Sequence, residues 1–362
     1  MRKPRKSVAL LAITLIATAS ALTACTSGGS GSSSSDSGGA SGDTVKVGLL
    51  LPESKTTRYE SFDRPLFEDK LKTLGDYEIV YANADQDAAK QQQQAESALT
   101  EGVKVLVLDP VDAAAAASIV ANAASQDVPV ISYDRLVKSD QLDYYISFDN
   151  EQVGKLQGQA LVDKLNADGT TTGMIMINGS PTDGNAAQFK AGANSVIESS
   201  DIPVLASYDT PDWSPDKAQE WAAGQITQFG DQISGVYAAN DGTAGGAIAA
   251  LKAAGVTPIP PVTGQDAELA AIQRIVAGDQ FMTVYKAIKE EAELAAEITH
   301  QLAQGETPEG DTDVDGTPST LLTPVVVTVD NIQDTVVADG FYTVDEICTA
   351  EYAEACAAAG LQ

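Results

Sequence analysis

The chain has 362 residues, of which 43% are hydrophobic and 20% are charged, a composition typical of a soluble globular protein with roughly two domains. It is strongly acidic, with 51 acidic residues against 22 basic ones and a formal net charge of −29. Such a charge argues against nucleic acid or anionic lipid head groups as binding partners.

The N-terminal segment is typical of a secretory signal. A basic start at residues 1–6 precedes the apolar run 8–22, which is too short for a membrane-spanning helix. The run ends in Leu-Thr-Ala-Cys at residues 22–25, which resembles a bacterial lipobox. The resemblance implies that residues 1–24 are a lipoprotein signal peptide and that Cys25 is acylated. An ordinary secretory signal with a chance cysteine is the alternative.

A stretch rich in Ser and Gly follows Cys25 up to residue 42. It cannot bury apolar surface, so we expect residues 25–43 to form a flexible linker between the lipid anchor and the folded body. The anchor would be the only attachment to the membrane.

From residue 45 onward, the pattern alternates between strands and helices. The first series predicts strands at 45–51, 78–82, 103–108, 128–133 and 144–148, with helices at 60–74, 85–101 (capped by Asp85) and 113–126. The second series predicts helices at 150–164, 185–198, 215–229, 243–254 and 268–277, with strands at 173–177, 203–208, 235–239, 262–264 and 282–285. This alternation predicts an α/β fold with parallel sheets.

The end of the chain departs from this alternation. A helix at 287–304 is followed by a polar loop at 305–318 and a strand at 321–329, which has no helix after it and should extend an existing sheet. We therefore expect two lobes joined by several crossings. Residues 44–148 and about 286–318 would form the N-terminal lobe, and residues 149–285 and about 319–362 the C-terminal lobe.

Polar and aromatic residues follow many of the predicted strands. The buried strand in residues 128–135 ends in Asp134 and Arg135, and further residues of this kind at strand ends are Arg58, Tyr59, Asn178, Asp183, Asn185, Trp213, Asn240, Asp241, Gln265, Asp266, Tyr285 and Lys286. Ligands bind at the carboxyl ends of parallel strands. Carboxylates, amides and fixed cations beside aromatic rings suit a small neutral ligand that carries many hydroxyls.

Each of these residues also has a purely structural interpretation. Asp134 and Arg135 could form a structural ion pair, Asn240 and Asp266 could cap helices, and Trp213 could be a hydrophobic staple. Lys286 could be a solvated helix residue. Their joint position favours a binding site, because helix capping does not require Trp, Arg and Lys at the same edge.

Seven phrases of the sequence resemble the periplasmic sugar-binding proteins of ABC transporters, and within them the D-xylose-binding branch. They are Tyr133–Arg135, Tyr145–Glu151, Gly179–Asn185, Ala239–Gly246, Gly264–Ala267, Met282–Lys286 and Leu322–Pro324. The resemblance implies two Rossmann-like lobes joined by a three-stranded hinge, with the sugar held between them.

The resemblance also implies the residues that contact the sugar. The hydroxyls would be bound by Arg58, Asp134, Arg135, Asp183, Asn185, Asn240, Asp266 and Lys286, and the ring faces would pack on Tyr59 and Trp213. Tyr59 stands where the xylose branch has tryptophan, and Gly184 where it has asparagine. D-xylose is therefore the expected ligand, with glucose, arabinose, ribose and galactose as alternatives.

The function implied is that of a monomeric, extracytoplasmic lipoprotein without cofactor, which closes on a monosaccharide and delivers it to an ABC-transporter permease and its ATPase. A sugar-acting enzyme is the main alternative, because Asp134 and Asp266 could act as paired carboxylates. Arg135 should keep its neighbour ionised, which favours binding over proton transfer. A sugar-responsive repressor would need a DNA-binding segment where the signal and linker stand.

The remaining cysteines, Cys348 and Cys356, lie eight residues apart. On one continuous helix their Cα atoms would be about 12 Å apart, too far for a disulfide, so the predicted bridge requires a turn near residues 349–351. Asp311, Asp313 and Asp315 resemble the start of a calcium loop. Leu322 stands where the bidentate Glu would be needed, which favours a solvated acidic loop over a metal site. The single histidine, His300, is expected to be exposed on a helix.

Overall fold

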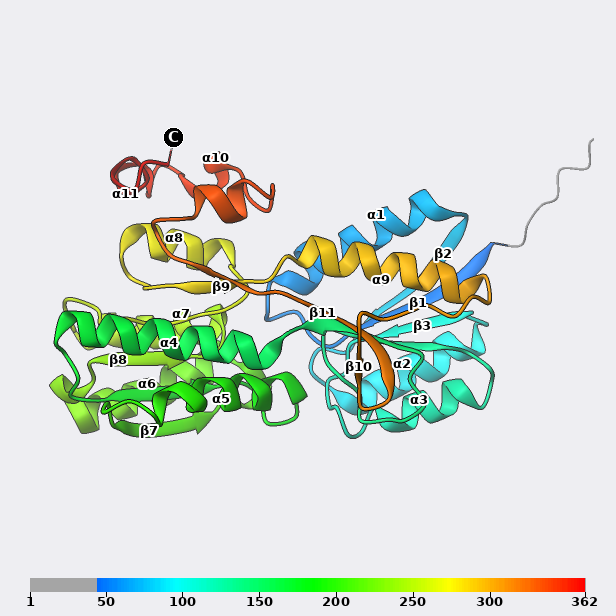
Figure 1. The fold of residues 1–362 in the computed structure, drawn as a ribbon, viewed down its shortest axis with the longest axis horizontal. Helices are drawn as coiled ribbons and strands as arrows, with labels where there is room; N and C mark the ends of the chain where they lie inside the picture. The colour runs from blue at the N-terminus through cyan, green and yellow to red at the C-terminus, as the bar shows by residue number, and fades with distance from the viewer. Residues whose placement is uncertain (1–43, 362) are drawn as a thin grey trace, which may run out of the picture. The chain divides into compact units, whose positions relative to one another are not determined.

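The computed structural model describes residues 44–361, so the predicted signal peptide, Cys25 and the predicted linker lie outside the described residues. The first sheet has seven strands in the order β10-β11-β5-β4-β3-β1-β2 (Figure 1). Their bounds are β1 (Val45–Leu51), β2 (Tyr77–Asn83), β3 (Val105–Leu108), β4 (Val130–Tyr133), β5 (Tyr144–Phe148), β10 (Thr312–Val314) and β11 (Thr317–Leu322). All neighbours pair in parallel except β10 and β11, which form an antiparallel hairpin.

Helices cover both faces of this first sheet. They are η1 (Tyr59–Asp63), α1 (Arg64–Leu74), α2 (Ala88–Thr100), α3 (Ala117–Ala124) and α9 (Ile288–Ala303). Side chains alternate along a strand, so Val47 and Leu49 pack toward α1 and α9, whereas Leu50 packs toward α2 and α3 (Figure 1). We call this sheet and its helices the first lobe.

The second lobe is built on a smaller parallel sheet in the order β7-β6-β8. Its strands are β6 (Met174–Asn178), β7 (Val204–Asp209) and β8 (Gly235–Ala238), and its helical segments are α4 (Asn150–Asp168), α5 (Gly184–Ile197), η2 (Pro211–Trp213), α6 (Pro215–Phe229), η3 (Gly230–Gln232), α7 (Asp241–Ala253) and α8 (Leu269–Ala277). Helices α4 and α5 approach closely at Gly154 and Gly192. A Cβ at either position would lie 1.9 Å from a backbone oxygen of the other helix.

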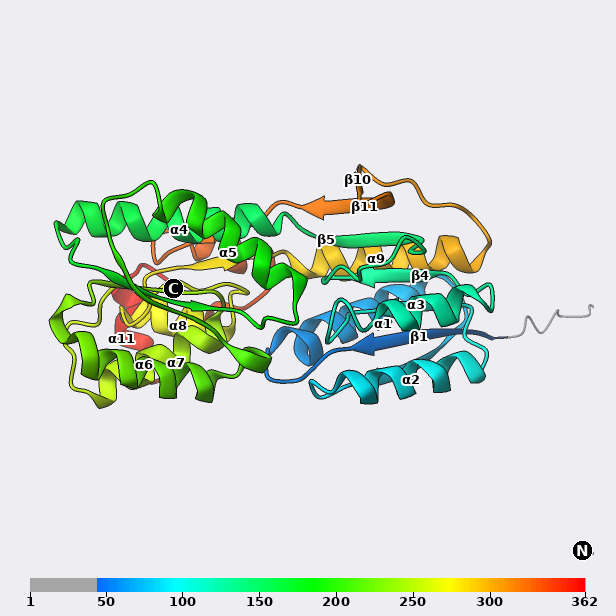
Figure 2. The same cartoon turned by 90° about the horizontal axis from the view of Figure 1, so that it is seen from below.

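The chain crosses between the lobes after β5, after β9 (Thr283–Tyr285) and between β11 and β12 (Val325–Val327). Figure 2 shows β11 beside β5. Strands β9 and β12 pair antiparallel in the second lobe. The tail, η4 (Gln333–Val337), α10 (Val344–Ile347) and α11 (Ala353–Ala358), packs on α8 and β12. It contains the predicted disulfide, Cys348–Cys356, with the chain turning between α10 and α11.

The α/β class and the two lobes are confirmed, but several local predictions need correction. Helix α2 is capped by Asp87, whose carboxylate accepts hydrogen bonds from the N–H groups of Ala89 and Lys90, and not by Asp85. The strand expected at 262–264 is reduced to one bridge between Val262 and Val236. His300 is partly buried, with Nδ1 2.5 Å from the hydroxyl of Tyr77, rather than exposed.

The strand expected at 321–329 is interrupted at residues 323 and 324, where Pro324 has no N–H for a sheet. Its first part, in β11, pairs with β5, so residues 319–322 belong to the first sheet and not to the second lobe. The expected loop at 305–318 contains β10. Asp315 and Gly316, both with positive φ, form the tight turn of the β10–β11 hairpin.

Among residues 44–361, every helix is too short or too polar to cross a bilayer.

Candidate functional site

A cavity with about 260 Å³ of empty space lies where strand ends of both lobes meet. It is lined by Thr56, Tyr59, Asp134, Arg135, Asp183, Asn185, Phe189, Trp213, Asn240, Gln265, Asp266 and Lys286. A larger pocket of about 1420 Å³ on the same measure lies near Pro258 and Phe281, and none of the predicted site residues lines it. The smaller cavity is therefore the candidate site, because the polar strand ends converge there.

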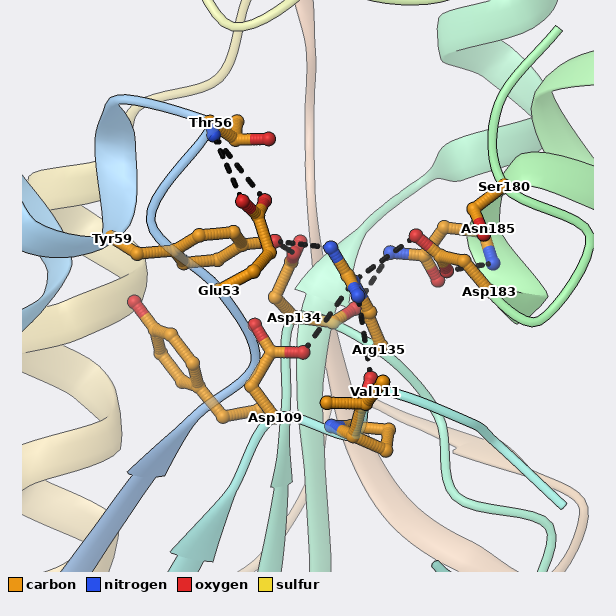
Figure 3. Close-up of polar contacts among 12 residues, drawn as sticks. Glu53, Thr56, Tyr59, Asp109, Val111, Asp134, Arg135, Ser180, Asp183 and Asn185 are labelled. Carbon is orange, nitrogen blue, oxygen red and sulfur yellow. Dashed lines mark hydrogen bonds and ion pairs between the residues drawn. The ribbon is translucent and has the colours of Figure 1, made fainter. Parts of the chain in front are cut away.

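The first-lobe wall is centred on Asp134 and Arg135, directly after β4 (Figure 3). Asp134 has a φ of 54°, a conformation that Asp adopts more readily than most residues. Its Oδ2 accepts a hydrogen bond from the hydroxyl of Tyr59 at 3.0 Å, and Nη2 of Arg135 donates to that same hydroxyl at 3.0 Å. The three side chains therefore hold one another in place.

Arg58 lies behind this wall instead of on it. Its guanidinium donates to Asp63, to Glu291 at 2.5 Å and to Asp134 at 3.2 Å, and it is absent from the cavity lining. The hydroxyl of Tyr133 also donates to Asp63. The N–H groups of the Arg58 guanidinium are therefore bonded to carboxylates. The guanidinium holds Asp134 in place from the side away from the cavity.

The charges around Asp134 keep it ionised. Burial alone raises its pKa, but Arg58, Lys286 and Arg135 outweigh burial and hold the pKa well below its usual range. For Glu291, in contrast, burial is the dominant cause and raises the pKa to about 8. Asp134 is thus a permanent hydrogen-bond acceptor at the cavity.

The second lobe contributes the loop before α5 and the turn before α6. Asp183 caps α5 by accepting a hydrogen bond from the N–H of Asn185 at 2.8 Å, and its Oδ2 accepts one from Nε1 of Trp213 at 2.9 Å. Phe189, on α5, meets Trp213 edge to face with ring centroids 6.3 Å apart. Burial raises the pKa of Asp183, and Arg135 opposes this.

The rest of the second-lobe wall comes from the segments between β8 and α8 and from Lys286, directly after β9. Asn240 does cap α7, since its Oδ1 accepts from the N–H of Thr243 at 2.9 Å, yet it also lines the cavity. Lys286 is buried, 3.1 Å from Oδ1 of Asp266 and 3.6 Å from Oδ1 of Asp134, and is not a solvated helix residue. Asp266 has a φ of 95°, a strained conformation for this residue type, and does not cap α8.

Two oxygens of this wall keep hydrogen-bonding capacity. Oε1 of Gln265 and Oδ1 of Asp266 are buried and accept no hydrogen bond from any described residue, although Asp266 is ion-paired with Lys286. Buried polar atoms are nearly always hydrogen-bonded in native proteins. The two oxygens therefore mark where the cavity can receive donors.

Nine of the ten binding residues predicted from the sequence line this one cavity, and Arg58 is the exception. Sequence reasoning left out Thr56, Phe189 and Gln265. Gln265 stood in the strand-end inventory beside Asp266, and Phe189 lies four residues after Asn185 on the same face of a helix, so both carried a signal. Thr56 carried none. No group of three or more residues able to hold a metal ion occurs among residues 44–361.

A family model described as "Periplasmic binding protein domain" matches residues 47–307. The chain belongs to the periplasmic binding protein family. Its relatives include the D-xylose-binding periplasmic protein of Escherichia coli, 38% identical over 85% of this chain and 94% of that protein. The multiple sugar-binding periplasmic receptor ChvE of Rhizobium radiobacter is 31% identical over 85% of this chain and 93% of that protein.

Solved structures agree with this periplasmic binding protein fold. The ABC-transporter solute-binding protein of Clostridium phytofermentans, crystallised with bound β-D-glucose, matches with a TM-score of 0.76 and 30% identity over 83% of this chain and 99% of that chain. The chain is thus a binding protein rather than an enzyme, which removes the paired-carboxylate alternative.

Proposed function

We propose that the protein is an extracytoplasmic receptor that captures a monosaccharide in the cavity between its lobes and delivers it to the permease of an ABC transporter. The observation that carries this proposal is a buried cavity, lined in part by aromatic rings, in which Oε1 of Gln265 accepts no hydrogen bond from a described residue and Oδ1 of Asp266 has only Lys286 as a partner. A pyranose presents hydroxyls to such acceptors and apolar C–H faces to rings.

The first-lobe wall supports the same ligand class. Arg135 is a fixed donor of this wall and Asp134 a fixed acceptor that stays ionised, and Lys286 of the second-lobe wall lies 3.6 Å from Asp134 as a further fixed donor. Each sugar hydroxyl both donates and accepts, so a wall of both kinds can satisfy a neutral ligand. Because the cavity is buried, a sugar that lacks one of the hydroxyls would leave a protein group unpaired and bind far more weakly.

D-xylose is the proposed preferred sugar. Two relatives named as D-xylose-binding periplasmic proteins are 38% and 35% identical over 85% of this chain. Glucose is the second candidate, because the structure with β-D-glucose bound is 30% identical. Tyr59 and Gly184 are the positions where this sequence departs from the xylose pattern, so they are where a different preference would arise.

Titration calorimetry of the body Thr44–Gln362 against D-xylose, D-glucose, L-arabinose, D-ribose and D-galactose tests this function. We expect tight binding of D-xylose and recovery of the sugar unchanged. Asp266→Ala should abolish binding, whereas Asp212→Ala, in an exposed pair with Lys217, should not. If the protein binds only another sugar, it is still a sugar receptor, but the proposed preference for D-xylose is wrong. If it binds no sugar of this panel, the proposed function is overturned.

We also propose that Cys25 carries the lipid anchor that holds this receptor at the cell membrane. In cells fed a labelled fatty acid, the wild-type chain should take up label and stay with the membrane fraction. Cys25→Ser should remain unlabelled and be released. A membrane-bound Cys25→Ser chain would contradict the anchor.

A further inference from the structure

We infer that Asp183 is a positioning residue that latches the two lobes together through Arg135, and that it stabilises the closed form without selecting among sugars. We call the pair Arg135 and Asp183 the closure latch. Its effect on sugar affinity rests on the proposed function, whereas its effect on closure does not.

The latch joins the lobes at buried atoms. Nε of Arg135, in the first lobe, lies 3.0 Å from Oδ2 of Asp183, in the second lobe, and both side chains are only 3% exposed. Every other polar contact of the guanidinium is made within the first lobe, to the hydroxyl of Tyr59, to the carbonyl of Pro110 at 3.3 Å and to Asp109 (Figure 3). Arg135 is therefore held by its own lobe whether or not Asp183 is near.

A second carboxylate competes for the same edge of Arg135. Oδ1 of Asp109 lies 3.5 Å from Nε, and neither oxygen of this fully buried residue accepts a hydrogen bond from a described residue. Asp109 is the guanidinium's partner within the lobe, and Asp183 is the nearer partner across the lobes. Lobe closure thus adds Asp183 to a cation that is already positioned.

The loop around Asp183 makes further contacts across the lobes. The carbonyl of Thr182 accepts a hydrogen bond from the N–H of Ala113 at 3.1 Å, and the side-chain amide of Asn185 donates to the carbonyl of Asp134 at 3.0 Å. Three residues within four positions therefore touch the first lobe. This concentration is what a docking loop requires, since each contact exists only when the lobes are together.

The carboxylate of Asp183 is also largely committed to protein partners. It accepts hydrogen bonds from Asn185 and Trp213, and Nε of Arg135 lies 3.0 Å from its Oδ2, so both of its oxygens already have protein partners. Oε1 of Gln265, in contrast, accepts no hydrogen bond from a described residue. A residue that favours closure without reading hydroxyls should change the affinity for every sugar by one common factor, because apparent affinity scales with the population of the competent form.

The test measures closure without sugar in the body Thr44–Gln362, which forms a compact unit of its own. Cysteines placed at Ala113 and Thr182, whose backbones meet in the closed form, are oxidised at a fixed rate, and the rate of cross-linking reports how often the lobes close. Asp183→Asn keeps the helix cap and removes the charge, and should slow cross-linking about fivefold or more. Asp183→Ser, which also caps helices, is the second variant should the first fail to fold.

Asp109→Asn is the matched control, because it removes an equally buried carboxylate from the same guanidinium within the first lobe. It should leave cross-linking at the wild-type rate or raise it. Equal slowing by both variants, or no slowing by the Asp183 variants, would overturn the latch even if every sugar binds. If only the Asp183 variants slow cross-linking and the wild-type protein binds no sugar, the closure latch is supported and the proposed function is overturned.

Calorimetry completes the test. Asp183→Asn should weaken binding of every sugar that the wild type binds by the same factor, about tenfold, with the ratios between sugars unchanged within about twofold. Trp213→Phe removes the hydrogen bond that Nε1 of Trp213 donates to Asp183 but keeps the ion pair with Arg135, and should change those ratios. A loss confined to one sugar in Asp183→Asn would make Asp183 a hydroxyl ligand and contradict the latch.

Discussion

The two walls of the cavity differ in how much hydrogen-bonding capacity they have left. At the first-lobe wall, Asp134 is ion-paired with Arg58 and accepts a hydrogen bond from the hydroxyl of Tyr59, to which Arg135 also donates. In the second-lobe wall, Oε1 of Gln265 accepts no hydrogen bond from a described residue, and Oδ1 of Asp266 has only its ion pair with Lys286. We infer that the two walls have different roles. The first wall is a rigid, charged support, and the second wall accepts hydrogen bonds from the hydroxyls of the ligand.

The largest effect should come from removing the cation beneath the first wall. Arg58→Met leaves Asp63, Asp134 and Glu291 together in the interior without their shared partner. We expect the free energy of unfolding to fall by about 3–5 kcal/mol in denaturant titrations, because breaking a buried ion pair strands its charges. Arg64→Met, at a guanidinium that is 38% exposed, is the control and should cost no more than about 1 kcal/mol. Equal losses would contradict a special role for the buried network.

A pH titration tests Asp241, a buried carboxylate behind the second wall. Behind the second wall, burial raises the pKa of Asp241 to about 7, although Arg274 opposes this. The folded state therefore binds a proton that the unfolded state, with a pKa near 4, has released. Stability should fall as pH rises from about 4 to 7, by at most about 1.4 kcal/mol per pH unit. The slope should be shallower in Asp241→Asn, and an unchanged slope would show that Asp241 does not titrate there.

Removing the charge of Asp266 should affect binding more than folding. Asp266→Asn keeps the shape and tolerates the positive φ, but it leaves Lys286 with Asp134 as its remaining carboxylate partner. We expect sugar affinity to fall about 30-fold in calorimetry, since a hydrogen bond to a charged group is worth about 1.5–3 kcal/mol. The unfolding midpoint should change much less than in Arg58→Met. A loss of stability as large as in that variant would end the distinction between the walls.

The smallest effect should come from the uncharged acceptor of the second wall. Gln265→Leu fills similar space but removes Oε1, so a sugar hydroxyl that donates to it would lose its partner. We expect affinity for the preferred sugar to fall about tenfold, with smaller losses for sugars that lack the matching hydroxyl. A change of the same size for all sugars, measured on one panel, would assign Gln265 to the structure of the wall instead of to recognition.

Much of the fold and most of the site could be predicted from local patterns. The strands at 45–51 and 144–148 and the helix at 215–229 agree with the structure residue for residue. Some element boundaries could not be predicted. Asp85 and Asp87 are both suitable caps for α2, so the sequence does not distinguish them. The turn at Asp315 and Gly316 joins two strands that are too short to be distinguished from a loop. The strand at 321–329 failed because an apolar run does not say which sheet its two halves join.

The sequence by itself determined the class of the molecule, the strand ends that carry polar residues and the pairing of Cys348 with Cys356, because periodicity and short spacings are local properties. Only the tertiary structure decided how each strand-end residue is used. Arg58 meets Glu291, 233 positions away, and lies outside the cavity lining, whereas Oε1 of Gln265 accepts no hydrogen bond from a described residue. Which donors and acceptors remain for a ligand depends on partners that are distant in the chain, and no local pattern records them.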